Sequence, residues 1–221
     1  MDIKFNRNGY FAAQTKTSKM KKVFLLSVLF CSVTGFSQKM RYGALMGMNA
    51  YDIEVSGPLI AGGGLSGLNV GGFMDYQFST HCGLKVNMIF NQTTETDYGP
   101  LESGTFYELF DEAKLTTLQF QPLIKFDVNK VYAKGFYLQG GFNMVNVLSA
   151  KDDEGTSVKS FYNSSSISGM FGFGVTFLKH YSFELMGSYS LTNTIGYPES
   201  KAKNIGAYTN LVIDIESFLH K

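Results

Sequence analysis

The chain has 221 residues, of which 17% are charged and 15% are aromatic, and it has no Trp. The charged fraction lies below the roughly 25% of an ordinary soluble domain, and no apolar run reaches the roughly 20 residues that a membrane helix requires. The low charged fraction therefore argues against an ordinary soluble domain, and the lack of a long apolar run argues against membrane-spanning helices. Any contact with hydrocarbon is expected to be made by strands.

The segment 20–37 has the three parts of an export signal: two lysines, an apolar stretch, and the small residues Gly35 and Ser37 before the predicted cleavage point. Residues 1–19 are polar and are interpreted as a gene-model extension or a disordered segment. Cleavage leaves residues 38–221 as the mature domain. The removed part has six basic residues and one acidic residue, so the net charge falls from +1 to −4. A mildly acidic product argues against nucleic acid as a partner.

Apolar and polar residues alternate with a period of two along most of the mature chain, which is typical of strands. The clearest example is Leu68–Asn91, where a polar break at 79–82 separates two alternating runs and predicts an antiparallel hairpin. The same pattern predicts eight strands, at 41–50, 68–78, 84–91, 115–127, 135–148, 166–177, 181–192 and 204–216.

The predicted connections alternate between short turns and longer loops, and the longer ones are 52–64, 93–112, 149–160 and 194–203. Short turns on one rim and long loops on the other are typical of an outer-membrane barrel with both termini in the periplasm. Aromatic residues gather near the short-turn rim, as an interfacial girdle would: Tyr42, Tyr76, Phe78, Phe126, Phe136, Phe177 and Tyr181.

The polar face of the strands favours the membrane form of such a barrel. A soluble barrel of the lipocalin kind also has eight alternating strands, but its polar face meets water and should be rich in Lys and Glu. Here that face is mostly Gly, Asn, Gln, Ser and Thr. The predicted fold is therefore all-β: an eight-stranded antiparallel up-and-down transmembrane β-barrel, preceded by a cleaved signal peptide, in the outer membrane of a Gram-negative bacterium.

Three stretches resemble a known family. The signal end GFSQ with the strand RYGALMGMN, the strand QPLIKF and the strand YSFELMGSYSLTN are similar to the small outer-membrane β-barrel proteins (PorT-like, OmpA-like) of Bacteroidota. The resemblance covers Met20 to Lys221 and implies an outer-membrane barrel; the family is named for a secretion-linked member. Many such barrels end on an aromatic residue, whereas here three residues follow Phe218.

Eight charged residues fall on the predicted inward face. An eight-stranded barrel is just wide enough for side chains to fill it, so they are expected to form an ion-pair network that stabilises the barrel. An ion path or gate is the functional alternative. Asp75 and Lys85 lie on adjacent strands, and closure should bring Arg41 near the last two acids. The eight are Arg41, Asp75, Lys85, Lys125, Asp127, Glu184, Asp214 and Glu216.

Two other features suggest function. His180 and Ser182, followed by Glu184, resemble the His-x-Ser of lipid A deacylase barrels, but the predicted topology puts them at a short turn, away from outer-leaflet lipid. A turn is the simpler interpretation, and no catalytic residue is predicted. The loop 93–112 has exposed aromatic residues that often mark a contact surface: Tyr98, Phe106, Tyr107 and Phe110.

No cofactor or metal site is predicted, because the three histidines are scattered and the acidic loop charges are expected to be solvated. The sequence thus predicts a non-enzymatic barrel that contacts outer-membrane lipid. It is expected to have a structural or partner-binding role, through its long loops, as a subunit of an envelope or secretion complex. A narrow pore and a lipid-modifying enzyme using His180 and Ser182 are the alternatives.

Overall fold

The computed structural model describes residues 40–56, 59–60, 62–102, 105–106, 110–129, 131–196 and 201–219. The predicted export signal and the segment ahead of it lie outside the described residues.

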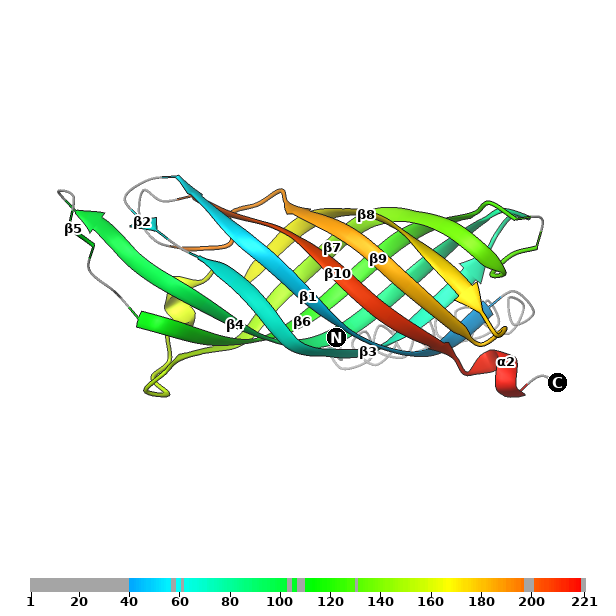
Figure 1. The fold of residues 1–221 in the computed structure, drawn as a ribbon, viewed down its shortest axis with the longest axis horizontal. Helices are drawn as coiled ribbons and strands as arrows, with labels where there is room; N and C mark the ends of the chain where they lie inside the picture. The colour runs from blue at the N-terminus through cyan, green and yellow to red at the C-terminus, as the bar shows by residue number, and fades with distance from the viewer. Residues whose placement is uncertain are drawn as a thin grey trace, which may run out of the picture. The chain divides into compact units, whose positions relative to one another are not determined.

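Eight long antiparallel strands form a closed barrel (Figure 1). Each strand pairs with its neighbours in sequence, and the last strand pairs with the first from Gly43↔Asp214 to Ser56↔Lys201, which closes the ring. The fold prediction of an eight-stranded antiparallel barrel is therefore confirmed. The strands are β1 (Met40–Ser56), β3 (Gly63–Gln77), β4 (Cys82–Glu102), β6 (Phe110–Asp127), β7 (Gly135–Asp152), β8 (Ser165–Phe177), β9 (Tyr181–Ser190) and β10 (Lys201–Asp214).

Among the described residues, four short elements lie outside the eight long strands. The two-residue strands β2 (Leu59–Ile60) and β5 (Thr105–Phe106) pair with the C-terminal end of β4, and the turn η2 (Lys159–Phe161) lies between β7 and β8. The helix α2 (Glu216–Leu219) follows β10. None of the helices in the described part of the chain is long and apolar enough to cross a membrane.

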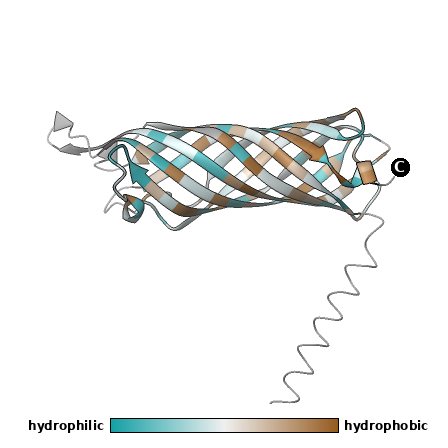
Figure 2. Ribbon diagram, turned by 90° about the horizontal axis from the view of Figure 1, so that it is seen from below, coloured by the Kyte–Doolittle hydropathy of each residue, from teal (hydrophilic) through white to brown (hydrophobic). Residues whose placement is uncertain are grey.

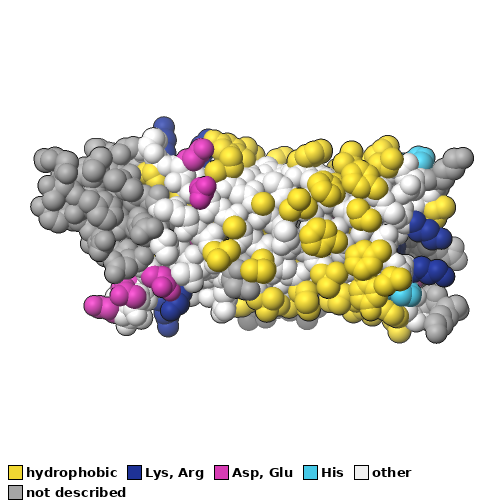
Figure 3. All heavy atoms as spheres, viewed as in Figure 1, with side chains coloured by type: hydrophobic (Ala, Val, Ile, Leu, Met, Phe, Trp, Pro, Cys, Tyr) yellow, Lys and Arg dark blue, Asp and Glu magenta, His cyan; other side chains and the backbone are white. Residues whose placement is uncertain are grey.

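The outer wall carries a broad apolar band. Hydrophobic and hydrophilic residues alternate along the strands in Figure 2, and Figure 3 shows apolar side chains over the part of the barrel nearer α2, with charged groups toward both ends. Burying such a band in hydrocarbon removes apolar surface from water, which is favourable. Large side chains exposed on this wall include Met46, Met74, Met88, Ile124, Phe142, Phe171, Phe183 and Ile205.

The strands continue well beyond the apolar band, and this corrects the predicted loops. The predictions of loops at 52–64 and 93–112 were wrong, because β1 runs to Ser56 and β4 to Glu102, while β6 begins at Phe110. The loop predicted at 149–160 also begins later, since β7 continues to Asp152.

The polarity of the alternation reverses in this extension. Ile53, Ala113 and Leu115 face inward and are buried, whereas Glu54 and Lys114 face outward and are exposed. A strand that has left the hydrocarbon meets water outside, so its apolar residues turn to the interior. We call this part of the barrel the collar; it comprises residues 51–56, 92–96, 112–116, 147–152 and 201–204.

The C-terminal strand begins and ends earlier than predicted: it spans Lys201–Asp214 instead of 204–216, so the loop predicted at 194–203 ends before Lys201. β10 ends at Asp214, and the carboxylate of Asp214 accepts a hydrogen bond from the backbone N–H of Ser217 at 3.3 Å, which caps the start of α2. Glu216 therefore lies in a helix beyond the barrel. Its placement among the lumenal charges was wrong.

Candidate functional site: the barrel lumen

The predicted inward charges gather at the short-turn end of the barrel in what we call the ionic belt. Three ion pairs hold it: Arg41 with Asp214, Lys85 with Glu184, and Lys125 with Asp75 at 3.1 Å. Lys125 also lies 3.7 Å from Asp127. Apart from Arg41, each of these side chains is almost completely buried. Seven of the eight predicted charges belong to the belt: Arg41, Asp75, Lys85, Lys125, Asp127, Glu184 and Asp214.

Closure of the ring predicted that Arg41 lies near Asp214, and the two are paired in the structure, but the other partners in the belt are not those that strand adjacency suggested. Asp75 and Lys85 are directly opposite each other on β3 and β4. Lys85 nevertheless pairs with Glu184 of β9, a strand that is not a neighbour of β4, and Asp75 pairs with Lys125 of β6. The belt therefore bridges the lumen instead of running around its wall.

Two tyrosines complete the belt. The hydroxyl of Tyr137 donates to Glu184 Oε1 at 2.6 Å, and that of Tyr132 donates to Asp75 Oδ1 at 2.5 Å. The ammonium of Lys125 lies 4.3 Å and 4.6 Å from the ring centroids of Tyr137 and Tyr132. In the turn between β6 and β7, burial and then the charge of Asp75 raise the pKa of Tyr132, so this phenol stays a neutral donor. Buried charges that are paired and hydrogen-bonded in this way are tolerated.

Apolar side chains fill part of the lumen as well. These residues occupy the inward positions of strands whose other inward residues are polar, and they form two clusters. One cluster consists of Leu45, Phe73, Ile89 and Val212. The other consists of Leu123, Met170, Met186 and Tyr208.

An amide network also occupies the interior. Asn91 Nδ2 donates to Asn49 Oδ1 at 2.9 Å and to Asn69 Oδ1, and Asn143 Nδ2 donates to the hydroxyl of Tyr208 at 3.1 Å. Several buried amide atoms, including Nδ2 of Asn69 and Oδ1 of Asn143, have no protein partner among the described residues. Buried amides of this kind are ordinarily satisfied by water.

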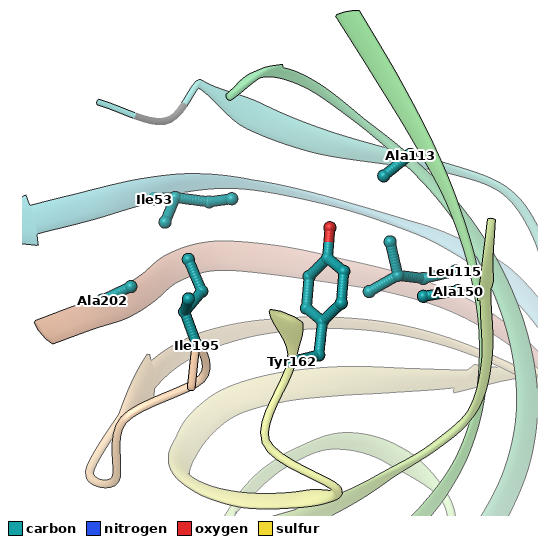
Figure 4. Packing of buried hydrophobic residues seen from close by; sticks show 7 residues of the cluster. All are labelled: Ile53, Ala113, Leu115, Ala150, Tyr162, Ile195 and Ala202. Carbon is teal, nitrogen blue, oxygen red and sulfur yellow. The ribbon is translucent and has the colours of Figure 1, made fainter. Parts of the chain in front are cut away.

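At the other end, apolar side chains close the mouth of the barrel. Tyr162 comes from the connection between β7 and β8, and Ile195 from the connection between β9 and β10. Figure 4 shows both side chains among inward residues of the collar. We call this cluster the mouth plug; it consists of Ile53, Ala113, Leu115, Ala150, Tyr162, Ile195 and Ala202.

A carboxylate is buried within the mouth plug. Glu95 of β4 is only 2% exposed and accepts hydrogen bonds from the hydroxyls of Tyr51 and, at 2.9 Å, Tyr162. Sequence reasoning missed these three residues, because Glu95 fell in a presumed loop. The continued alternation of Thr93 and Glu95 with outward Thr94 was the signal that could have placed it.

The histidine and serine of the enzyme alternative bind other residues. His180 Nδ1 lies 2.5 Å from Ser217 Oγ, and the His180 ring stacks on Phe218 with centroids 3.9 Å apart. Ser182 Oγ lies 2.8 Å from Thr176 Oγ1. His180 and Ser182 thus each bond to another residue, whereas the enzyme alternative needs His180 in contact with Ser182 to activate it.

The side chains of the predicted contact residues in the loop 93–112 lie outside what the structure describes. Tyr107 lies outside the described residues, as do the side chains of Tyr98, Phe106 and Phe110. Within the part of the chain that the structure describes, no group of three or more His, Cys, Asp or Glu is placed to hold a metal ion.

Comparison with known proteins identifies the family. Solved structures with similarity to the chain include Ail, the attachment invasion locus protein of Yersinia pestis (10% identity, 79% of this chain and 98% of that chain, TM-score 0.46). They also include OprG of Pseudomonas aeruginosa (14%, 79% and 91%, 0.40) and Neisserial surface protein A (12%, 76% and 96%, 0.44). A comparison with curated proteins gives no significant match. The family model described as "Outer membrane protein beta-barrel domain" matches residues 36–196, so the chain belongs to this family of outer-membrane β-barrels.

Proposed function

We propose that this protein is a non-enzymatic outer-membrane barrel with a closed lumen, and that its role is to bind partner proteins as a subunit of an envelope or secretion complex. The observation that carries the proposal is the double closure of the lumen. The ionic belt bridges it at one end, and the mouth plug fills it at the other. The outer wall contacts lipid, so the collar and its loops are the surface left for partners. The resemblance to PorT-like barrels of Bacteroidota supports the same proposal.

The proposal includes an orientation, with both termini in the periplasm and the collar outside the cell. The charged collar and longer connections support it, because short turns face the periplasm in barrels of this kind. Accessibility of cysteines tests it. In a Cys82→Ser background, Glu54→Cys in the collar should react with a membrane-impermeant thiol reagent in intact cells. Lys179→Cys at the short-turn rim should react only after the outer membrane is permeabilised; the reverse pattern would overturn the orientation.

Partner binding is tested by purifying the tagged protein from outer membranes in mild detergent and identifying what accompanies it. Stoichiometric companions are expected, and the collar variant Asp52→Lys/Glu54→Lys should lose them. The matched control is Lys179→Glu, which changes charge at the other rim and should retain them. Recovery as a lone, heat-modifiable monomer would contradict the proposal.

A narrow pore is the second candidate. One observation favours it: buried amide atoms without protein partners among the described residues imply water inside the barrel. The ionic belt interrupts any such path. The lipid-modifying alternative has weaker support, since His180 and Ser182 bond to other residues. Unchanged lipid A in cells that overproduce the protein would argue against it.

A further inference from the structure

The mouth of the barrel is covered by two loops that act as one unit. Tyr162 and Ile195 form a β-bridge, the backbone N–H of Gly196 donates to the carbonyl of Phe161 at 2.8 Å, and that of Asn163 donates to the carbonyl of Thr194 at 3.1 Å. The side chain of Asn163 also donates to two carbonyls of the second loop. The two connections therefore form a single cover with Tyr162 on its inner side.

A cavity of about 70 Å³ lies under this cover. A cavity needs roughly 10–15 Å³ on this measure to hold one water, so there is room for several waters or one small ligand. Three tyrosine side chains, one carboxylate and a set of amides and hydroxyls line it. They include Tyr51, Tyr162, Tyr208, Glu95, Asn49, Asn91, Thr93 and Thr117.

The lining selects the charge of a ligand. Among the lining residues, Glu95 carries the one formal charge, and it is held in place by the hydroxyls of Tyr51 and Tyr162. A buried carboxylate disfavours anions strongly and favours a cation that can donate hydrogen bonds to it. The side chains of Tyr51, Tyr162 and Tyr208 line the same space, and tyrosine rings attract a cation placed over their faces. The amide and hydroxyl oxygens can accept the remaining N–H groups.

We propose that this cavity is a binding site for a small organic ammonium ion, held by Glu95 and the surrounding tyrosines and closed by the cover that bears Tyr162. The ring of Tyr162 limits the size of the ligand, and its hydrogen bond to Glu95 keeps the cover shut. The site lies on the inner side of the collar, whereas protein partners are assigned to its outer surface and loops, so either proposal can fail without the other.

Titration of the detergent-solubilised protein with methylammonium chloride tests the site, with sodium chloride at equal ionic strength as the reference and calorimetry or tyrosine fluorescence as the readout. Saturable binding is expected for the wild type. Glu95→Gln should weaken it by at least about tenfold, because the countercharge is lost. Glu54→Gln removes an exposed carboxylate of the collar and should leave binding unchanged. A heat-modifiability gel confirms that each variant is folded.

A second variant keeps the test decisive if Glu95→Gln does not fold. Tyr162→Ala removes the ring that limits the cavity, so the preference for methylammonium over tetramethylammonium should fall by about tenfold or more. Absence of saturable methylammonium binding to the wild type would overturn the proposal and leave the cavity as a water site. Equal affinities of Glu95→Gln and Glu54→Gln, or an unchanged size preference in Tyr162→Ala, would overturn it too.

Discussion

Replacing Lys85 with Met should destabilise the barrel strongly, because the ammonium of Lys85 is the cation paired with buried Glu184. Both side chains are almost fully excluded from water, at 3% and 0% exposure, and Glu184 also accepts a hydrogen bond from Tyr137. Removing one partner of a buried ion pair leaves an uncompensated charge and costs about 3–5 kcal/mol. We expect Lys85→Met to lose that amount of unfolding free energy.

The double variant Lys85→Met/Glu184→Met distinguishes the effect of an unpaired buried charge from the effect of placing Met at these two positions. Apolar replacement of both partners of a buried pair is often neutral or stabilising, so the double variant should recover most of the loss. The exposed pair Lys114–Glu112, at 3.4 Å, supplies the control: Lys114→Met should cost less than about 1 kcal/mol.

The assay is urea unfolding in lipid vesicles, followed by far-UV circular dichroism and by heat-modifiability on gels. Circular dichroism suits the chain because it has no Trp to report by fluorescence. A double variant as unstable as Lys85→Met alone, or a Lys85→Met variant no less stable than Lys114→Met, would refute the view that Lys85 and Glu184 form one energetic unit.

Two further predictions concern the wall of the barrel. Gly172→Val should destabilise it by about 1–3 kcal/mol or more in the same assay, because a Cβ there would lie 2.1 Å from the carbonyl oxygen of Leu185; Gly169→Ala, which meets nothing within 4 Å, should be tolerated. Phe171→Lys, in the middle of the lipid-facing band, should cost about 2–4 kcal/mol in vesicles, whereas Thr96→Lys on the collar, opposite Glu112, should be nearly neutral. Equal stabilities within either pair of variants would contradict the placement of these residues.

The positions of the strands could be predicted well because a period of two is a local signal. The hairpin across residues 79–82 lies where the alternation breaks, and β8 and β9 begin within one residue of their predicted starts. The inward face of each strand could also be predicted in the lipid-embedded part, because there the outward residues are the apolar ones.

The collar could not be read in the same way, because its outer face meets water. Charged and polar residues such as Glu54 and Lys114 look like loop composition, although they alternate with the buried residues Ile53, Ala113 and Leu115. Glu95 was missed for this reason, because it fell in a presumed loop. Tyr162 was missed for another reason: it reaches the lumen from a connection between strands whose path the sequence does not specify.

The pairing of the inward charges was predictable in part. Closure of the ring places Arg41 beside Asp214, and the structure pairs them. Register alone put Asp75 opposite Lys85, but long side chains in a narrow lumen reach across it, and Lys85 pairs with Glu184 instead. The sequence predicts whether a residue points inward and which strands lie beside it. A contact across the lumen depends in addition on the width and stagger of the closed barrel.

Planar-bilayer recording of the purified wild-type protein tests whether the lumen is closed. We predict no stepwise conductance, because the ionic belt and the mouth plug each block the path between the two ends. Reproducible unitary current steps from the wild type, absent with empty detergent, would contradict the closed lumen and make the narrow pore the better account of this barrel.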